Sequence, residues 1–92
     1  MRYAARVDAN QAAIVEALRK AGAYVWIIGL PVDIMAGYKG HTLLMEIKRD
    51  SKAKKTALQV DFFEKWTGGT LCRVDSVEAA LRVLAVLDAR TD

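Results

Sequence analysis

Two apolar segments separated by a turn dipeptide restrict the fold of this chain more than any other feature. Residues 32–38 and 42–48 are mostly apolar, and Lys39-Gly40 lies between them. Short apolar runs on either side of such a dipeptide predict a β-hairpin, whose two strands are antiparallel. A charged residue inside these strands needs a partner or a function, because burying an unpaired charge is costly.

Three charged residues lie on the strands of the predicted hairpin. Asp33 is on the first strand, and Glu46 and Lys48 are on the second. With the turn at the central dipeptide, Asp33 pairs near Glu46 or Ile47, and cross-strand Cβ atoms are about 4.5–5.5 Å apart. Because side chains alternate along a strand, Glu46 and Lys48 project from the same face.

The two acids of the hairpin point to a metal site. Neighbouring carboxylates repel each other unless a cation lies between them, and an oxygen-only site suits Mg²⁺ with waters completing the octahedron. Lys48 can then orient or help deprotonate a water and offset charge on a phosphate. The two acids and the lysine together predict metal-assisted hydrolysis of a phosphodiester bond. The alternative is an ordinary acid–lysine ion pair on an exposed sheet face.

Patterns on either side of the hairpin predict the order αβββαβα. The expected segments are a helix over 9–21, a strand over 24–28, a second helix opening at the capping box 56–59, a strand over 70–74 and a last helix ending near 89. A helix between the third and fourth strands allows a crossover that makes them parallel. We therefore expect one α/β domain, residues 1–92, with a mixed four-stranded sheet flanked by helices.

The charge distribution allows a nucleic-acid partner without requiring one. The net charge is +3, and basic side chains are concentrated directly after the hairpin. We expect this loop to hold a nucleic-acid backbone, although a run of charges is more often a solvated loop. The expected contacts are Arg49, Lys52, Lys54 and Lys55.

Composition further limits the partners and the compartment. The hydrophobic fraction is 53%, which leaves apolar surface for a second subunit in so small a domain. A single cysteine, Cys72, rules out an internal disulfide or a cysteine-based zinc site. No apolar run reaches the roughly 18 residues of a membrane span. We expect a cytoplasmic homodimer or higher homo-oligomer with no membrane partner.

Pro31-Val32-Asp33, followed after twelve residues by Glu46-Ile47-Lys48, resembles the signature of the PD-(D/E)xK nucleases. The αβββαβ order resembles the restriction-endonuclease-like core of that superfamily, which includes Holliday-junction resolvases. The chain looks more closely like the small stand-alone VRR-NUC-type nucleases of phages and bacteria. Further stretches that carry the resemblance are 8–18, 56–62 and 74–81.

The resemblance implies a Mg²⁺-dependent DNA endonuclease in which Mn²⁺ can substitute, acting in a bacterium or a phage-infected cell, with branched or junction DNA as a possible substrate. It implies metal ligation by Asp33, Glu46 and the backbone carbonyl of Ile47, with Lys48 as the catalytic lysine. Gln59 matches a glutamine that often faces the site from the second helix. The alternative is a non-catalytic nucleic-acid-binding module on the same fold.

The chain departs from the family pattern near the motif and on the first helix. An extra valine separates Pro31 from Asp33, and the segment before the motif is short and apolar. Many relatives carry an acid on the first helix. Here the candidates for that role are Gln11, which is an amide, and Glu16, which lies later in the helix.

Overall fold

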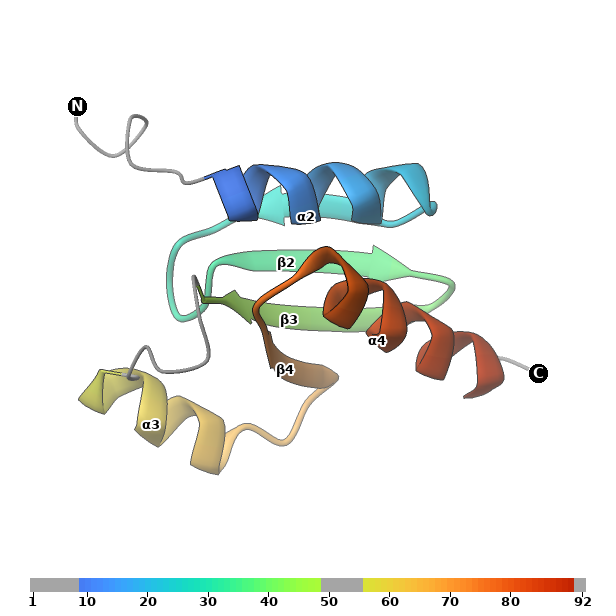
Figure 1. Ribbon diagram of the computed structural model, residues 1–92. Helices are drawn as coiled ribbons and strands as arrows, with labels where there is room; N and C mark the ends of the chain where they lie inside the picture. The colour runs from blue at the N-terminus through green and yellow to red at the C-terminus, as the bar shows by residue number, and fades with distance from the viewer. Residues whose placement is uncertain (1–8, 49–55, 91–92) are drawn as a thin grey trace.

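The computed structural model describes residues 9–48 and 56–90, and within them a four-stranded sheet is combined with three helices (Figure 1). The elements are α2 (Ala9–Lys20), β1 (Tyr24–Ile27), β2 (Ile34–Tyr38), β3 (His41–Ile47), α3 (Ala57–Lys65), β4 (Thr70–Val74) and α4 (Val77–Arg90). The predicted α/β class and order of elements are confirmed. None of these helices has the length and apolarity needed to cross a bilayer.

The sheet is mixed, as predicted. Its spatial order follows the chain, β1-β2-β3-β4; the pairs β1–β2 and β2–β3 are antiparallel, and the pair β3–β4 is parallel. The segment that contains α3 supplies the connection that a parallel pair requires. The carboxyl ends of β3 and β4 therefore lie at the same end of the sheet.

A two-residue turn sets the register of the β2–β3 hairpin. Lys39 and Gly40 have φ angles of 50° and 85°, the left-handed values that a type I′ turn requires at both central positions. The pairing Ile34↔Met45 follows from this turn. Continuing the same register by one residue brings Asp33 opposite Glu46, as the hairpin prediction required.

The predicted position of Asp33 on a strand is wrong by one residue. Strand β2 begins at Ile34, and the carbonyl oxygen of Asp33 accepts hydrogen bonds from the amides of Ile28 and Gly29 at 2.9 and 3.1 Å. These bonds hold Asp33 in the loop that leads into the strand. Lys48 likewise lies just after β3, although its amide still donates to the β4 residue Val74 at 2.9 Å.

The two faces of the sheet have different environments. Helices α2 and α4 pack on one face, where they cover the alternating core residues of the strands (Figure 1). The fully buried side chains of this core include Ile14, Leu18, Ile34, Leu43, Met45 and Leu87. The opposite face carries Met35, Leu44 and Glu46, because side chains alternate along each strand.

Helix α3 reaches this second face without a buried residue of its own. It begins at the predicted capping box: Thr56 Oγ1 accepts from the Gln59 amide at 3.2 Å, and Gln59 Oε1 accepts from the Thr56 amide at 3.1 Å. The reciprocal pair satisfies two amides that the helix leaves without internal partners. The hydrogen bond from Gln59 Nε2 to Glu46 joins the first turn of α3 to the sheet, and Phe62 and Phe63 of this helix are partly buried.

Candidate metal and active site

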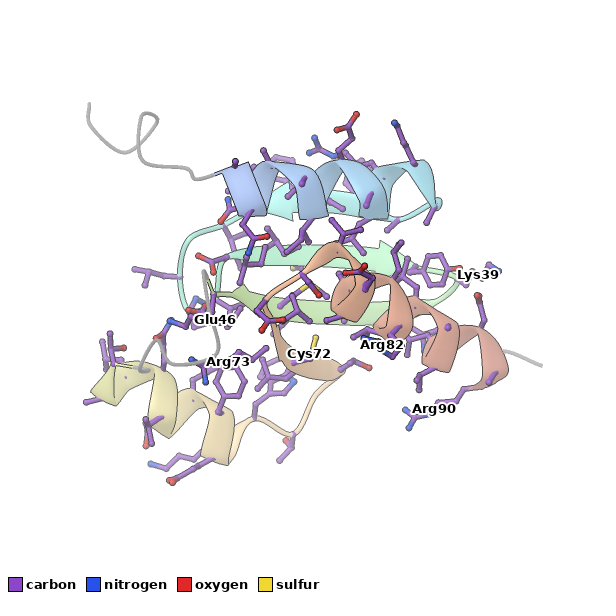
Figure 2. All side chains as sticks on the ribbon, in the orientation of Figure 1. Lys39, Glu46, Cys72, Arg73, Arg82 and Arg90 are labelled. Carbon is purple, nitrogen blue, oxygen red and sulfur yellow. The ribbon has the colours of Figure 1, made fainter. Side chains whose placement is uncertain are left out.

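Glu46 is the centre of a polar cluster at the end of β3 (Figure 2). Only 4% of the residue is exposed, and its Oε2 atom accepts from Lys48 Nζ at 3.0 Å and from Gln59 Nε2 at 2.7 Å. Its second carboxylate oxygen, Oε1, is buried without a hydrogen-bond partner among the described residues. A buried carboxylate oxygen without a hydrogen-bond partner lowers the stability of the fold unless another group or ion binds it.

Asp33 completes a pair of neighbouring carboxyl groups. Its Oδ2 atom accepts from the Ile47 amide at 2.7 Å, which fixes the side chain against β3. Burial raises the pKa of Asp33, and the nearby charge of Glu46 raises it further. The Ile47 amide and Lys48 lower the pKa but do not reverse the shift. The raised pKa therefore reflects chiefly the burial of Asp33, and the neighbouring carboxylate of Glu46 makes a smaller contribution.

Lys48 is held by its backbone as well as by its side chain. Its side chain is only 14% exposed where it pairs with Glu46. Its carbonyl oxygen accepts from Asn10 Nδ2 at 2.9 Å, and the same amide group donates to the Asp75 carbonyl at 3.2 Å. Asn10, in the first turn of α2, therefore fastens the ends of β3 and β4 together. Sequence reasoning missed this role, because both contacts join residues far apart in the chain.

Gln59 joins the site to helix α3. Its Oε1 atom completes the capping box with Thr56, while its Nε2 atom donates to Glu46 Oε2. The capping role and the site role, which the sequence offers as separate possibilities, are both filled by one side-chain amide. Asp33, Glu46, Lys48 and Gln59 are thus brought together.

The donor set of this cluster fits a divalent cation that prefers oxygen ligands. Asp33 and Glu46 provide carboxylate oxygens, one of which is buried without a hydrogen-bond partner among the described residues, and the Ile47 carbonyl lies on the chain between Glu46 and Lys48. No group of three or more histidine, cysteine, aspartate or glutamate residues occurs in the part of the chain that the structure describes. A cation here would take its remaining ligands from water, as Mg²⁺ usually does.

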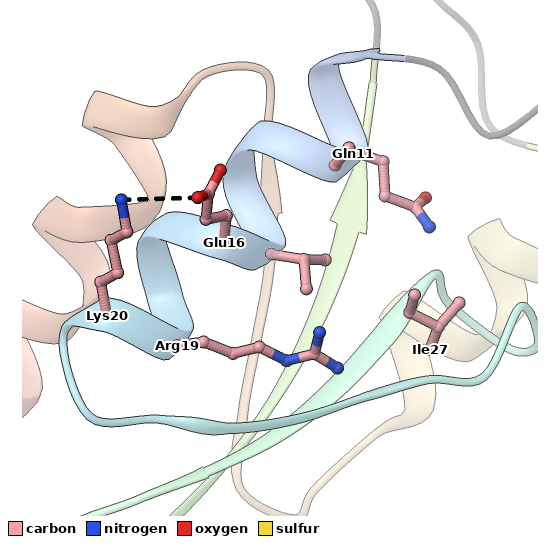
Figure 3. A pocket seen from close by; sticks show the side chains of 7 residues that line it. Gln11, Glu16, Arg19, Lys20 and Ile27 are labelled. Carbon is pink, nitrogen blue, oxygen red and sulfur yellow. Dashed lines mark ion pairs between the residues drawn. The ribbon is translucent and has the colours of Figure 1, made fainter.

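The first-helix candidates lie in a different depression, of about 470 Å³, between α2 and the end of β1 (Figure 3). Gln11 and Glu16 line it together with Arg19 and Ile27. Glu16 Oε2 pairs with Lys20 Nζ at 3.4 Å, and both side chains are largely exposed. The structure does not place either candidate among the groups that contact Glu46. The predicted nucleic-acid contacts Arg49, Lys52, Lys54 and Lys55 lie outside the described residues.

Comparison with protein-family models, with curated proteins and with solved structures finds no match for this chain. The interpretation of the site therefore depends on the residues that form it.

Proposed function

We propose that this chain is a Mg²⁺-dependent DNA endonuclease with a restriction-endonuclease-like core of the PD-(D/E)xK type, in which Mn²⁺ can substitute. The observation that carries the proposal is the adjacent pair Asp33 and Glu46, with one buried carboxylate oxygen left unpartnered and Lys48 at 3.0 Å from the other. The mixed sheet with its αβββαβ order supports the same assignment.

In this proposal Asp33, Glu46 and the Ile47 carbonyl hold the cation. Once bound, Mg²⁺ supplies polarisation of a phosphoryl oxygen and a lowered pKa for a coordinated water. Gln59 and Lys48 both donate to Glu46 Oε2, and this orientation leaves Oε1 available for the metal. The Ile47 amide performs the equivalent task for Asp33 by binding its Oδ2 atom.

Lys48 has donors left for the reaction. An ammonium group carries three N–H donors, and Glu46 Oε2 takes one of them. The others can orient the attacking water and offset negative charge on the phosphate. The low exposure of Lys48 strengthens these interactions, because charges interact more strongly where water is scarce.

A cleavage screen tests this function. Linear, nicked, flapped and four-way branched DNA would be incubated with the protein in Mg²⁺ and in Mn²⁺, and nicked products measured on denaturing gels. Asp33→Asn, Glu46→Gln and Lys48→Met preserve side-chain size, and each is expected to lower cleavage by about 10²-fold or more. Glu16→Gln is the matched control, because Glu16 is exposed, pairs with Lys20 within α2 and lies outside the Glu46 cluster in the described part of the chain. If the wild type nicks none of these substrates in Mn²⁺, the nuclease proposal is wrong.

One observation favours the alternative of a non-catalytic nucleic-acid-binding module. The Glu46–Lys48 pair is close and buried, so the acids can serve the fold as an ion pair. A binding module would bind DNA equally well with or without divalent cations, and Glu46→Gln would change its stability but not its DNA affinity. The same titrations in Mg²⁺ and in EDTA therefore separate the two functions.

We also propose a homodimer, because cutting both strands of a duplex requires two such sites. Apolar side chains on the uncovered sheet face support this, namely Tyr24 and Trp26 on the edge strand β1 and Met35 on β2, all of which are exposed.

A further inference from the structure

Arg73 lies beside Glu46 in the parallel pair β3–β4. The strand register aligns the two residues directly, so their side chains leave the same face of the sheet. Arg73 is exposed whereas Glu46 is buried, so the guanidinium lies on the solvent side of the candidate site. Figure 2 shows both labelled side chains at the end of the sheet that α3 approaches.

A small cavity joins Arg73 to the lysine of the site. It has a volume of about 190 Å³ and is lined by Lys48, Arg73, Val74, Asp75 and Ala79. Pockets for drug-sized molecules are usually about 300–1,000 Å³, so this cavity matches a single small charged group better than a base with its sugar. Two of its lining residues are cationic and one is acidic.

The two cations differ in what they offer a ligand. Lys48 pairs with Glu46, and in the proposed nuclease its position next to the carboxylates assigns it to the scissile phosphate. The Arg73 guanidinium is planar and can bind a phosphate through two parallel hydrogen bonds. The Asp75 carboxylate repels an anion in this cavity and lowers the affinity of the cavity for that anion.

We propose that this cavity binds a phosphodiester of the DNA next to the one that is cut, with Arg73 as the principal contact. The inference rests on the proposed nuclease function, because it takes Lys48 to mark the reacting phosphate. Arg73 then sets the direction in which the strand crosses the ends of β3 and β4. A second anchored phosphate also prevents the reacting one from rotating away from Lys48.

Fluorescence anisotropy with labelled linear and branched DNA, in EDTA and over a range of KCl concentrations, tests the subsite. Arg73→Gln is expected to weaken binding at low salt about tenfold and to lower the slope of log affinity against log salt by about one unit. Arg73→Lys should restore the slope, because it keeps the charge, but only part of the affinity. Asp75→Asn should strengthen binding severalfold, since it removes the opposing charge.

Arg90→Gln is the matched control, because it removes one exposed arginine from the last turn of α4, away from the cavity (Figure 2). Equal salt slopes for the wild type, Arg73→Gln and Arg90→Gln would overturn the subsite, as would a wild type that binds none of these DNAs. If the slope falls only in Arg73→Gln but the wild type cleaves nothing in Mn²⁺, Arg73 contacts a DNA phosphate but the nuclease function fails, and with it the placement of that phosphate next to a cut one. If the wild type cleaves and the slopes are equal, the function stands and the subsite fails.

Discussion

Asp33→Asn should make the metal-free protein more stable and insensitive to Mg²⁺. The asparagine keeps an oxygen acceptor for the Ile47 amide, whose present bond to Asp33 is 2.7 Å. It also removes one of two neighbouring negative charges and places an N–H donor near Glu46, whose Oε1 atom has no described partner. Leaving a buried polar atom unsatisfied costs about 1–3 kcal/mol.

Asp33 is only half-buried, and Lys48 already offsets part of its repulsion with Glu46. We therefore expect Asp33→Asn to raise the free energy of unfolding by about 1–2 kcal/mol. For a domain of this size each kcal/mol raises the melting temperature by about 4–8 °C. The assay is thermal unfolding followed by circular dichroism, in EDTA and in MgCl₂. A cation at ten times its dissociation constant stabilises the wild type by about 1.4 kcal/mol, and this gain should be absent in the variant.

The pH dependence of the stability difference between Asp33→Asn and the wild type is a separate check. The pKa of Asp33 is raised above its ordinary value of 3.8, so the protonated carboxyl is favoured by folding. The destabilisation that the ionised Asp33 carboxylate causes in the wild type is absent below pH 3.8. It develops as the pH rises through the raised pKa. The stability advantage of Asp33→Asn should therefore grow from acid to neutral pH.

A matched control is Asp61→Asn, which removes an exposed aspartate paired with Lys65 on α3. It should change stability by less than about 0.5 kcal/mol and leave the Mg²⁺ response intact. The reasoning is refuted if Asp33→Asn is less stable than the wild type in EDTA at neutral pH, or if it retains the Mg²⁺ response.

Four further predictions follow from other parts of the molecule. Asn10→Ala removes two side-chain hydrogen bonds and should lower the free energy of unfolding by about 1–2 kcal/mol in chemical denaturation. The proposed cleavage should also fall, because Lys48 is less well held. Burial raises the pKa of the Cys72 thiol from 9.0 to about 11, so iodoacetamide should label it at pH 8 about 100-fold more slowly than in the unfolded chain; equal rates would contradict this. Hydrogen bonds from Lys39 and Tyr38 lower the pKa of Asp88 below 3.8, so the stability lost in Asp88→Asn should be present at neutral pH and vanish as the pH falls below that value. The proposed homodimer predicts that Trp26→Glu gives a monomer in sedimentation velocity where the wild type is a dimer, without unfolding the protein, because Trp26 is 56% exposed.

The hairpin could be predicted because its information is local. The left-handed dipeptide Lys39-Gly40 sets the register, and the register in turn brings Asp33 and Glu46 together. The capping box that starts α3 is equally local, since its two partners are three positions apart. Each of these features depends on the geometry of a single turn.

Asn10 and Arg73 could not be identified in the same way. Asn10 acts on Lys48 and Asp75, which are 38 and 65 positions away. Arg73 meets Glu46 only through the parallel register of β3 and β4, and the crossover that sets this register leaves no short-range signal in the chain. The start of β2 was misplaced for a related reason, because amides from the preceding loop hold the backbone of Asp33.

The side-chain amide of Gln59 makes position 59 unusually intolerant of substitution. A single group accepts at the start of α3 and donates to Glu46. Glutamate would keep the acceptor but add a third negative charge to the site, and lysine would keep a donor but leave the helix uncapped. Fraying of α3 at its first turn would therefore also remove one of the two described donors to Glu46 Oε2, so a change made to this helix acts on the acid at the end of β3.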